Sequence, residues 1–271
     1  MPAVHAAHAS FGPLLRRWRQ SRGLSQEKLA EQAEVSPRHL SFLENGRSAP
    51  SRDMVLALAG TLDLPLRDQN ALLGSAGFSA AFTESALESR ELAMVRRALD
   101  RLLAKQEPYP AIVVDPAWNV SRMNQGAQRL FVWALAGRQP PPEVLANAMR
   151  ATLHPEGLRP VIVGWRELAG ALIARTRRDL DHRPDPRVEA LLREVLDYPD
   201  VPRGISANAV PPGPFLPVHL RRDQVELRFF TTLTTLGTPL DVTAQEVHIE
   251  SYFPADEPTE KFVCVLAGEP S

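Results

Sequence analysis

The stretch GLSQEKLAEQAEVSPRHLSFLENGRSAP (Gly23–Pro50) contains the signals for two short helices joined by a tight corner. Ser25 stands where an N-cap belongs, and the helix Gln26–Ala33 is predicted to follow it. Ser36 is placed to cap a second helix. Its first residue is Pro37, which suits that position because its missing N–H would have had no helical partner. The stretch therefore predicts a helix-turn-helix.

The corner between these helices carries Glu34 where this motif usually has glycine. A left-handed backbone costs about 1 kcal/mol for a residue with a side chain. We therefore expect either a strained left-handed residue at Glu34 or a slightly different turn. Val35, Leu40 and Leu43 are predicted to point inward at helical spacing. Gly46 is predicted to end the second helix in the left-handed conformation.

The outward side chains of the second helix suit a DNA groove. A compact corner holds this helix clear of the body, so that its first residues can enter a major groove about 12 Å wide. Gln26, Ser36 and Asn45 are expected to hold phosphates and set the register. Arg38 and Ser41 are expected to read base edges, with Arg38 at a guanine. The predicted DNA-binding residues are Gln26, Ser36, Pro37, Arg38, His39, Ser41, Phe42 and Asn45.

These residues resemble the Cro/repressor-type (XRE) DNA-binding domain. The resemblance is carried by LSQ-x-x-LA (Leu24–Ala30), by VS at Val35 and Ser36, and by LENG (Leu43–Gly46). It implies an all-α domain whose partner is a double-stranded DNA operator. Phe42 stands where a polar residue is common, and either contacts a thymine methyl or packs back on the next helix. A helical hairpin that binds no DNA is the competing interpretation.

Length and composition predict about two soluble domains. The chain has 271 residues, of which 44% are hydrophobic and 23% charged. No run of 18 apolar residues occurs, and the start MPAVHAAHAS lacks the pattern of a signal peptide, so we expect no membrane partner. The single cysteine, Cys264, cannot form an internal disulfide and fits a reducing cytoplasm. Its neighbours predict that it lies in a buried strand, Phe262–Ala267.

The charge distribution favours specific over sequence-independent DNA binding. The formal net charge is −1, which argues against bulk coating of nucleic acid. Residues 1–78 hold nine Lys/Arg and seven Asp/Glu, a net charge of +2, and residues 79–271 therefore carry −3. Arg16, Arg17 and Arg19 cluster with Arg22 on the first predicted helix. We expect useful affinity to need dimerisation or good base contacts.

Local signals also place the remaining parts of the N-terminal half. Residues 1–10 are expected to form a disordered tail, and 11–78 a five-helix DNA-binding domain. The other helices of that domain are predicted over Phe11–Arg22, over Arg52–Leu62, and from Pro65 onward.

Residues 79–107 are predicted to form a linker helix, which a capping box of Ser85 and Glu88 begins and which ends near Gln106. Apolar residues recur along it at a spacing of 3, 4, 3: Leu92, Val95, Leu99 and Leu102. Two heptads are too few for a free coiled coil. This face either pairs with a second copy, as a palindromic operator would favour, or packs on the second domain of its own chain. The sequence leaves both interpretations open.

Residues 108–271 are predicted to form an α+β domain in which an antiparallel sheet carries helices. The predicted strands are Pro110–Asp115, Trp118–Met123, Phe215–Arg221, Gln224–Thr235, Val247–Phe253 and Phe262–Ala267. The predicted helices are Asn124–Phe131, Glu143–Thr152, Val161–Arg178 and Asp185–Leu196. A proline-rich crossing, Pro199–Pro217, is expected to lead into the last group of strands.

Three segments of this second half resemble the MmyB-like ligand-binding domain, a PAS-like module that follows an XRE head in bacterial regulators. They are PYPAIVVDPAWNVSRMNQGAQRLF (Pro108–Phe131), LHPEGLRP (Leu153–Pro160) and ELRFFTTLTTLGTPLDVTAQEVHIESYFPADEPT (Glu226–Thr259). The resemblance implies a transcriptional regulator whose second domain holds a small apolar ligand. A fatty acid is the ligand class associated with this family.

The candidate ligand-binding residues are aromatic or apolar, with one basic side chain: Phe131, Trp165, Leu172, Arg228 and Phe229. Arg228 either meets a carboxylate head group or forms a surface salt bridge. Apart from the bound apolar molecule, no cofactor is expected. A homodimer is expected, because a palindromic operator presents two half-sites.

Motifs of common catalytic and metal chemistry are absent from the sequence. It contains no GxxxxGK[ST], no GxGxxG after a strand and no GxSxG, and its seven histidines show no metal-ligand spacing. We therefore expect no catalytic residue and no metal. His154 is expected to turn a loop and Asp241 to cap a turn. The alternatives to a sensor are a dimerisation or partner-binding scaffold and, less favoured, an enzyme with a helix-turn-helix head.

Overall fold

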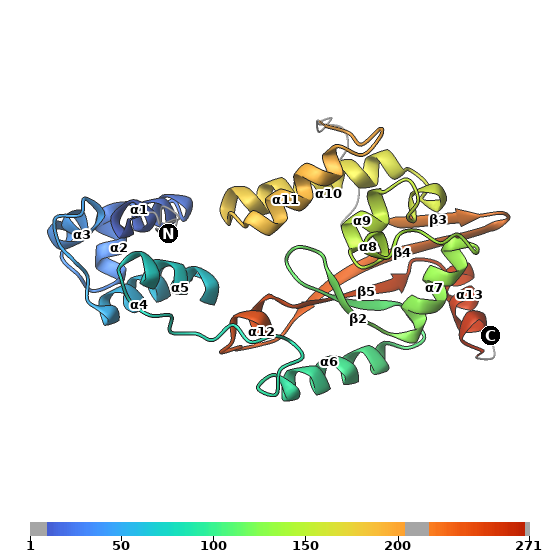
Figure 1. Cartoon of the computed structure of the whole chain (residues 1–271), viewed down its shortest axis with the longest axis horizontal. Coiled ribbons are helices and arrows are strands. Elements are labelled where there is room, and N and C mark those ends of the chain that lie inside the picture. The colour runs from blue at the N-terminus through green and yellow to red at the C-terminus, as the bar shows by residue number, and fades with distance from the viewer. Residues whose placement is uncertain (1–9, 204–216, 269–271) are drawn as a thin grey trace, which may run out of the picture. The chain divides into compact units, whose positions relative to one another are not determined.

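The computed structural model describes residues 10–203 and 217–268, and the chain divides into two compact units (Figure 1). The first unit comprises Met1–Ser89 together with Gly237–Gln245, and the second comprises Arg90–Leu236 together with Glu246–Ser271. The expected disordered tail, except for Ser10, and most of the proline-rich crossing lie outside the described residues. Within the described ranges, no helix combines the length and apolar character that crossing a bilayer requires.

The first unit is helical, as predicted. Its helices are α1 (Phe11–Ser21), α2 (Gln26–Gln32), α3 (Pro37–Glu44), α4 (Arg52–Thr61) and α5 (Leu66–Ser75). The hydroxyl oxygens of Ser25 and Ser36 accept hydrogen bonds from the N–H groups of Lys28 and His39, which confirms both predicted N-caps. The core is filled by leucines with little or no exposed surface: Leu15, Leu29, Leu40, Leu43, Leu58, Leu72 and Leu73.

Of the two alternatives expected for the corner between α2 and α3, the structure shows the strained left-handed residue. Glu34 has a φ of 55°, so a residue with a side chain occupies the left-handed region there. Gly46, with a φ of 68°, ends α3 as predicted. Helix α1 approaches α3 closely, because a Cβ atom added at Gly12 would lie 2.5 Å from the carbonyl oxygen of Glu44. These contacts hold α3 in a fixed position on the first unit.

The segment Gly237–Gln245 also belongs to this first unit, although it connects two strands of the other unit, β4 (Val225–Thr235) and β5 (His248–Pro254). Its backbone N–H at Val242 donates to the carbonyl oxygen of Thr83 at 2.8 Å. The side-chain oxygen of Gln245 accepts from the backbone N–H of Leu66, the first residue of α5, at 2.7 Å. The chain therefore leaves the sheet, joins the helical unit, and returns to the sheet.

The Asp241 carboxylate holds this connection in place through hydrogen bonds. One carboxylate oxygen accepts from the Thr83 hydroxyl at 2.9 Å and from the Ser85 N–H at 3.0 Å. The other accepts from the backbone N–H of Thr243 at 2.9 Å, at the start of α12 (Val242–Glu246). The predicted capping role of Asp241 is confirmed, and the same carboxylate also ties two segments that are distant in sequence.

The second unit is built on a five-stranded antiparallel sheet in the order β2-β1-β5-β4-β3. The strands are β1 (Ala111–Val114), β2 (Val120–Met123), β3 (Val218–Arg222), β4 (Val225–Thr235) and β5 (His248–Pro254). The last strand in the sequence lies at the centre, between β1 and β4. This order, with helices between β2 and β3, is the PAS-like α+β arrangement that was expected.

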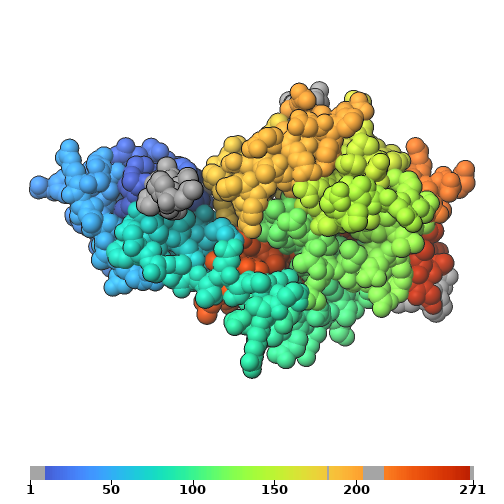
Figure 2. Space-filling view, in the orientation of Figure 1, coloured from blue at the N-terminus to red at the C-terminus, as the bar shows by residue number. Residues whose placement is uncertain are grey.

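Helices cover both faces of this sheet. Figure 1 shows α6 on one side and α8 to α11 on the other, and Figure 2 shows the helices from α8 to α11 as a continuous surface of the second unit. The helices are α6 (Ala93–Gln106), α7 (Gln125–Leu135), α8 (Pro142–Leu145), α9 (Ala148–Leu153), the 3-10 turn η1 (Arg159–Val161), α10 (Trp165–His182), α11 (Pro186–Leu196) and α13 (Glu257–Ala267).

The linker helix differs from the prediction at its start and on its buried face. Helix α6 begins at Ala93, and the N–H of Ser85 donates to Asp241, so the predicted capping box is wrong. Leu102 is 44% exposed, whereas Leu103 is 5% exposed. The buried face therefore runs through Leu99 and Leu103, four residues apart, because this spacing places both side chains against the sheet.

The predicted final strand, residues 262–267, is wrong, because these residues lie in α13. The Asp256 carboxylate caps this helix through the N–H of Thr259 at 2.9 Å, and a proline occupies its first turn. These start signals outweigh the strand preference of the run VCV. Cys264 is consequently a partly buried helix residue and does not lie in a buried strand.

Two predicted helices are interrupted. The helix expected over Glu143–Thr152 is divided into α8 and α9 at Asn147, whose side-chain oxygen caps α9. The helix expected over Val161–Arg178 starts only after Gly164, which has a φ of 66° and separates η1 from α10. In both cases a residue suited to capping or to a left-handed turn sets the boundary.

Candidate DNA interface and ligand cavity

The first turn of α3 and the residues around it are available to solvent. The predicted DNA-binding side chains on and beside α3 are all at least partly exposed: Ser36, Pro37, Arg38, His39, Ser41, Phe42 and Asn45. The Arg38 guanidinium lies 5.3 Å from the centroid of the Phe42 ring, one turn further along the helix. A cation at this distance is attracted to the ring, so Phe42 holds the arginine against the outer face of α3.

A buried carboxylate beneath this face joins α1, α2 and α3. Glu44 has no exposed side-chain surface, and it accepts from Arg19 Nε at 2.6 Å and Nη2 at 3.0 Å. Arg16 Nε donates to it at 3.2 Å and Gln26 Nε2 at 2.8 Å. Burial alone would raise the pKa of Glu44, but the hydrogen bonds from Arg19, Gln26 and Arg16 outweigh it and lower that pKa.

This cluster engages two of the predicted phosphate-binding residues. The side-chain amide nitrogen of Gln26 donates to Glu44, so Gln26 braces α3 from inside the unit. The Asn45 side-chain oxygen accepts from Arg16 Nη2 at 2.9 Å, and its nitrogen donates to the carbonyl oxygen of Ser41 at 2.8 Å. Arg16 and Glu44 were not among the predicted site residues. Their link to α3 joins positions 28 apart in sequence, which no local pattern reveals.

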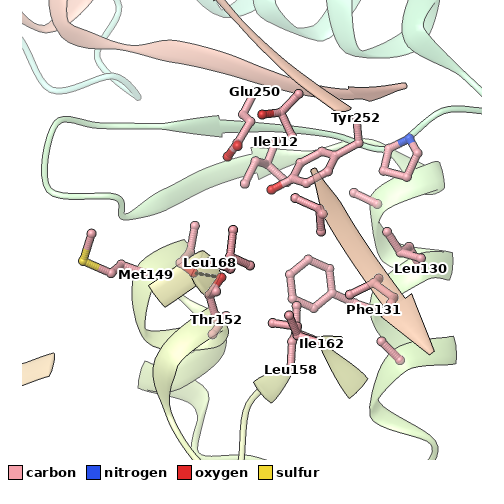
Figure 3. Close-up of a pocket in the computed structure, with 18 of the residues that line it drawn as sticks. Ile112, Leu130, Phe131, Met149, Thr152, Leu158, Ile162, Leu168, Glu250 and Tyr252 are labelled. Carbon is pink, nitrogen blue, oxygen red and sulfur yellow. Dashed lines mark hydrogen bonds between the residues drawn. The ribbon is translucent and has the colours of Figure 1, made fainter. Parts of the chain in front are cut away.

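The second unit contains an interior cavity of about 120 Å³ between the sheet and its covering helices (Figure 3). Apolar side chains form most of its wall, among them Ile112, Leu130, Phe131, Leu158, Ile162 and Leu168. An engineered apolar cavity of roughly 150 Å³ binds benzene. The cavity can therefore hold a small apolar molecule without rearrangement.

The cavity also has a polar side, formed by strand β5. Glu250 and Tyr252 point from this strand into the cavity, opposite Phe131 and Leu158 (Figure 3). Burial raises the pKa of the Glu250 carboxyl, although the Tyr252 hydroxyl and the Arg175 guanidinium oppose that rise. Burial also raises the pKa of Tyr252 well above its ordinary value. The Glu250 carboxyl and the Tyr252 hydroxyl also interact with each other, because each shifts the pKa of the other through a side-chain hydrogen bond.

A second cavity of about 320 Å³ adjoins the first, and Trp118 and Arg175 line both. The Arg175 guanidinium lies 5.9 Å from the centroid of the Trp118 ring and 3.8 Å from the Asp179 carboxylate. His248 also lines the second cavity, and burial lowers its pKa. Trp118 and Arg175 therefore lie where the two cavities adjoin.

The predicted ligand-binding residues divide between the cavity and its surroundings. Phe131 and Leu172 line the cavity. Trp165 and Phe229 are buried in the hydrophobic core of the same unit, and the Trp165 ring nitrogen donates to the carbonyl oxygen of Thr152 at 3.0 Å. Arg228 forms salt bridges of 2.5 Å with Glu226 and 3.1 Å with Asp256, the surface alternative that the sequence left open.

The residues that sequence reasoning missed share one strand face. His248, Glu250 and Tyr252 are spaced by two residues on β5, so their side chains lie on the same side of the sheet. Polar residues in strict alternation normally indicate a face turned to solvent. Here that face is covered by helices, which is a consequence of tertiary packing and has no local signal.

When the sequence is compared with known protein families, one family matches most of the chain. Residues 95–266 match the family described as MmyB-like transcription regulator ligand binding domain, and residues 15–69 match a helix-turn-helix family. No curated protein matches the chain. One solved structure, described as an RNA-binding Light-Oxygen-Voltage receptor, aligns with 97% of this chain and 64% of its own, at 13% identity and a TM-score of 0.27. A likeness this weak carries no argument about function.

Proposed function

The chain belongs to the family of MmyB-like transcription regulators, and we propose that it binds a specific DNA operator and senses a small hydrophobic molecule. One observation carries this proposal: a helix-turn-helix and an interior apolar cavity occur in the same chain. The helix supplies the means of binding DNA, and the cavity supplies a place for an effector.

For DNA recognition, we assign α3 to the major groove. Arg38 is the side chain expected to read a guanine, because its guanidinium is exposed and can donate two parallel hydrogen bonds. Ser41 is expected to contact a second base edge. Ser36 and Asn45 are expected to contact phosphates, and the buried cluster around Glu44 keeps α3 in a constant orientation.

For sensing, the effector occupies the cavity behind β5. A fatty acid is the ligand class that the family resemblance implies, and the cavity accepts about one ring or a short chain as it stands. A longer chain would pass the Arg175–Trp118 contact into the second cavity. The effector must bind one arrangement of the protein better than another, because otherwise it shifts no equilibrium.

The connection Gly237–Gln245 is the route that we propose for this signal. It joins β4 to β5, the strands that carry Thr231, Glu250 and Tyr252 on the cavity wall. It is held in the helical unit through Asp241. A ligand that moves either strand would therefore pull on a segment that packs with the DNA-binding helices.

We further propose that the protein acts as a homodimer. An operator with two half-sites one helical turn apart requires two DNA-binding units. On α6, Met94 is 74% exposed and Leu102 is 44% exposed, and these apolar side chains remain for a second copy. Sedimentation equilibrium tests this point, with a mass twice that of the chain expected and a monomer contradicting it.

Genomic SELEX on the purified protein tests the DNA-binding function, and native mass spectrometry tests the sensing function. We expect one enriched palindromic sequence and a bound molecule of low mass. A library with no enriched sequence would contradict the first. A protein that carries no ligand and shows no thermal shift with any apolar compound would contradict the second.

A further inference from the structure

Trp118 has a backbone conformation that a residue with a large side chain rarely adopts. Its φ is 64°, in the left-handed region, and it lies in the connection between β1 and β2. Its N–H donates to the carbonyl oxygen of Asp115 at 2.9 Å, and its own carbonyl oxygen accepts from the N–H of Ala148 at 2.8 Å. Strain of this kind persists only where the surrounding structure fixes it, and it is concentrated at binding sites. The strain therefore points to a function for the side chain that this connection positions.

The Trp118 side chain lies where the two cavities of the second unit adjoin. Among the described residues, Trp118 and Arg175 are the two that line both the cavity of about 120 Å³ and the cavity of about 320 Å³. The Arg175 guanidinium, which α10 contributes, lies over the Trp118 ring at 5.9 Å from its centroid. A cation in this position is attracted to the face of the ring, so the two side chains hold each other at this boundary.

The tryptophan is fixed more firmly than the arginine. The residue before it, Ala117, is buried, and its carbonyl oxygen accepts from Asn147 Nδ2 at 2.7 Å. The Arg175 guanidinium pairs with the Asp179 carboxylate at 3.8 Å, and these side chains are 45% and 70% exposed. An ion pair this long and this exposed contributes little. The boundary should therefore open by movement of the arginine.

Building on the proposed sensing function, we propose that Trp118 and Arg175 set the length of the apolar chain that the protein accepts. A chain that fits the first cavity ends at the boundary and leaves both side chains in place. A longer chain enters the second cavity by displacing Arg175 from the ring, and it loses their contact. Trp118 is then the residue that determines specificity, whereas the apolar wall of the first cavity binds chains of every length.

The apolar wall continues beyond this boundary, because Leu180, Val188 and Leu233 line the second cavity. Burying one further methylene group raises affinity about fourfold. The wild type should stop gaining affinity at the length that fills the first cavity. A variant without the indole ring should continue to gain affinity as the chain enters the second cavity.

The test measures how affinity depends on chain length. Isothermal titration calorimetry on the full chain gives dissociation constants for hexanoate, octanoate, decanoate and dodecanoate. In the wild type, we expect the affinity to stop rising beyond about eight carbon atoms, because a cavity of roughly 150 Å³ holds benzene. In Trp118→Ala it should continue to rise, so the ratio of the hexanoate to the dodecanoate constant should increase by at least about tenfold. 1-Hexanol fits the first cavity and should bind both proteins.

A glycine variant separates the boundary from the backbone strain. Trp118→Gly also lacks the indole ring, so it should show the same shift in chain length as Trp118→Ala. Glycine adopts the left-handed conformation without the cost that alanine has, so Trp118→Gly should have the higher melting temperature of the two. A residue with a structural role alone would change the melting temperature and leave the dependence on chain length as it is.

Arg175→Ala tests the other side of the boundary, and Arg166→Ala is its matched control. Arg166 also lies on α10 and pairs with an aspartate, Asp200, at 3.8 Å, but it lines neither cavity. Arg175→Ala should shift the preference toward dodecanoate, and Arg166→Ala should keep the wild-type profile. An effect of the arginine charge on the carboxylates would change all four acids alike and would cancel in the ratio.

The outcomes separate this inference from the function on which it rests. If short acids bind and Trp118→Ala keeps the wild-type dependence on chain length, the cavity stands and the boundary is wrong. Equal ratios in Arg175→Ala and Arg166→Ala would contradict the part assigned to the arginine. Benzene is the probe for the cavity itself. If benzene, 1-hexanol and the four acids all fail to bind the wild type, the sensing function fails as well.

Discussion

The Arg19 guanidinium and the Glu44 carboxylate form a two-point ion pair, with Nε at 2.6 Å and Nη2 at 3.0 Å, inside the helix-turn-helix unit. The Glu44 side chain has no exposed surface, and that of Arg19 is 10% exposed. The pair joins α1 to the end of α3, and Gln26 adds α2 through the same carboxylate. The orientation of the DNA-facing helix therefore depends on one buried charge and its donors.

Removing that charge should destabilise the first unit strongly. In Glu44→Gln, Arg19 would keep a buried positive charge without its counterion, and breaking such a pair costs about 3–5 kcal/mol. Hydrogen exchange of the amides in α1, α2 and α3 measures this loss directly. Glu31→Gln is the control, since Glu31 is 70% exposed and pairs only with Lys28 at the surface. Equal protection in both variants would contradict the assigned role of Glu44.

The same carboxylate should make the helical unit sensitive to acid. The pKa of Glu44 is lower in the folded protein than its ordinary value of 4.5, so the unfolded chain takes up the proton more readily. The stabilisation is therefore complete above about pH 4.5 and is lost as the pH falls through the lowered pKa. Urea titrations between pH 3 and pH 7 should show this loss in the wild type. In Glu44→Gln, the free energy of unfolding should lack this part of its dependence on pH.

Arg38→Ala should weaken operator binding by about 1–3 kcal/mol and relax the preference at a single base. Fluorescence anisotropy with the selected operator and its single-base variants measures both effects. Gln26→Ala should instead weaken all sequences alike, because Gln26 braces α3 through Glu44. Arg97→Ala, an exposed arginine of α6, is the control for the loss of one positive charge. Unchanged affinity and base preference in Arg38→Ala would contradict the assignment.

Asp241→Ala should separate sensing from DNA binding. It removes the hydrogen bonds to Thr83 and Ser85 that hold the β4–β5 connection in the helical unit. We expect hexanol to bind with unchanged affinity and the free protein to bind its operator normally. The effect of hexanol on operator affinity should fall by at least half. Asp181→Ala, an exposed aspartate of α10, should keep the full effect, and the route is wrong if both variants behave alike.

The helix-turn-helix could be predicted from the sequence because its signals are local. Serine caps stand directly before α2 and α3, and Gly46 ends the second helix. Each signal acts within one helical turn, so neighbouring residues suffice to place the elements. At Glu34 the sequence left a strained left-handed residue and a different turn open, and the φ of 55° selects the strained residue.

The cavity could not be predicted in the same way. Glu250 faces the cavity only because β5 lies between β1 and β4 in the sheet. In the sequence, β1 is more than a hundred residues away from β5, and the residues of β4 that pair with β5 are about twenty residues away. The sequence shows an alternating strand, and tertiary packing decides whether the polar side meets water or a cavity. The exposed Leu102 and the helical Cys264 are further cases where packing and capping override a short apolar pattern.

The most direct test of the central claim is the operator affinity of the full chain with and without a cavity ligand. Fluorescence anisotropy with the sequence enriched by genomic SELEX, before and after saturation with 1-hexanol, gives the two dissociation constants. The account predicts that they differ by at least about fivefold, the usual lower range of allosteric coupling. Identical constants, with hexanol shown by calorimetry to be bound, would contradict a ligand-sensing regulator.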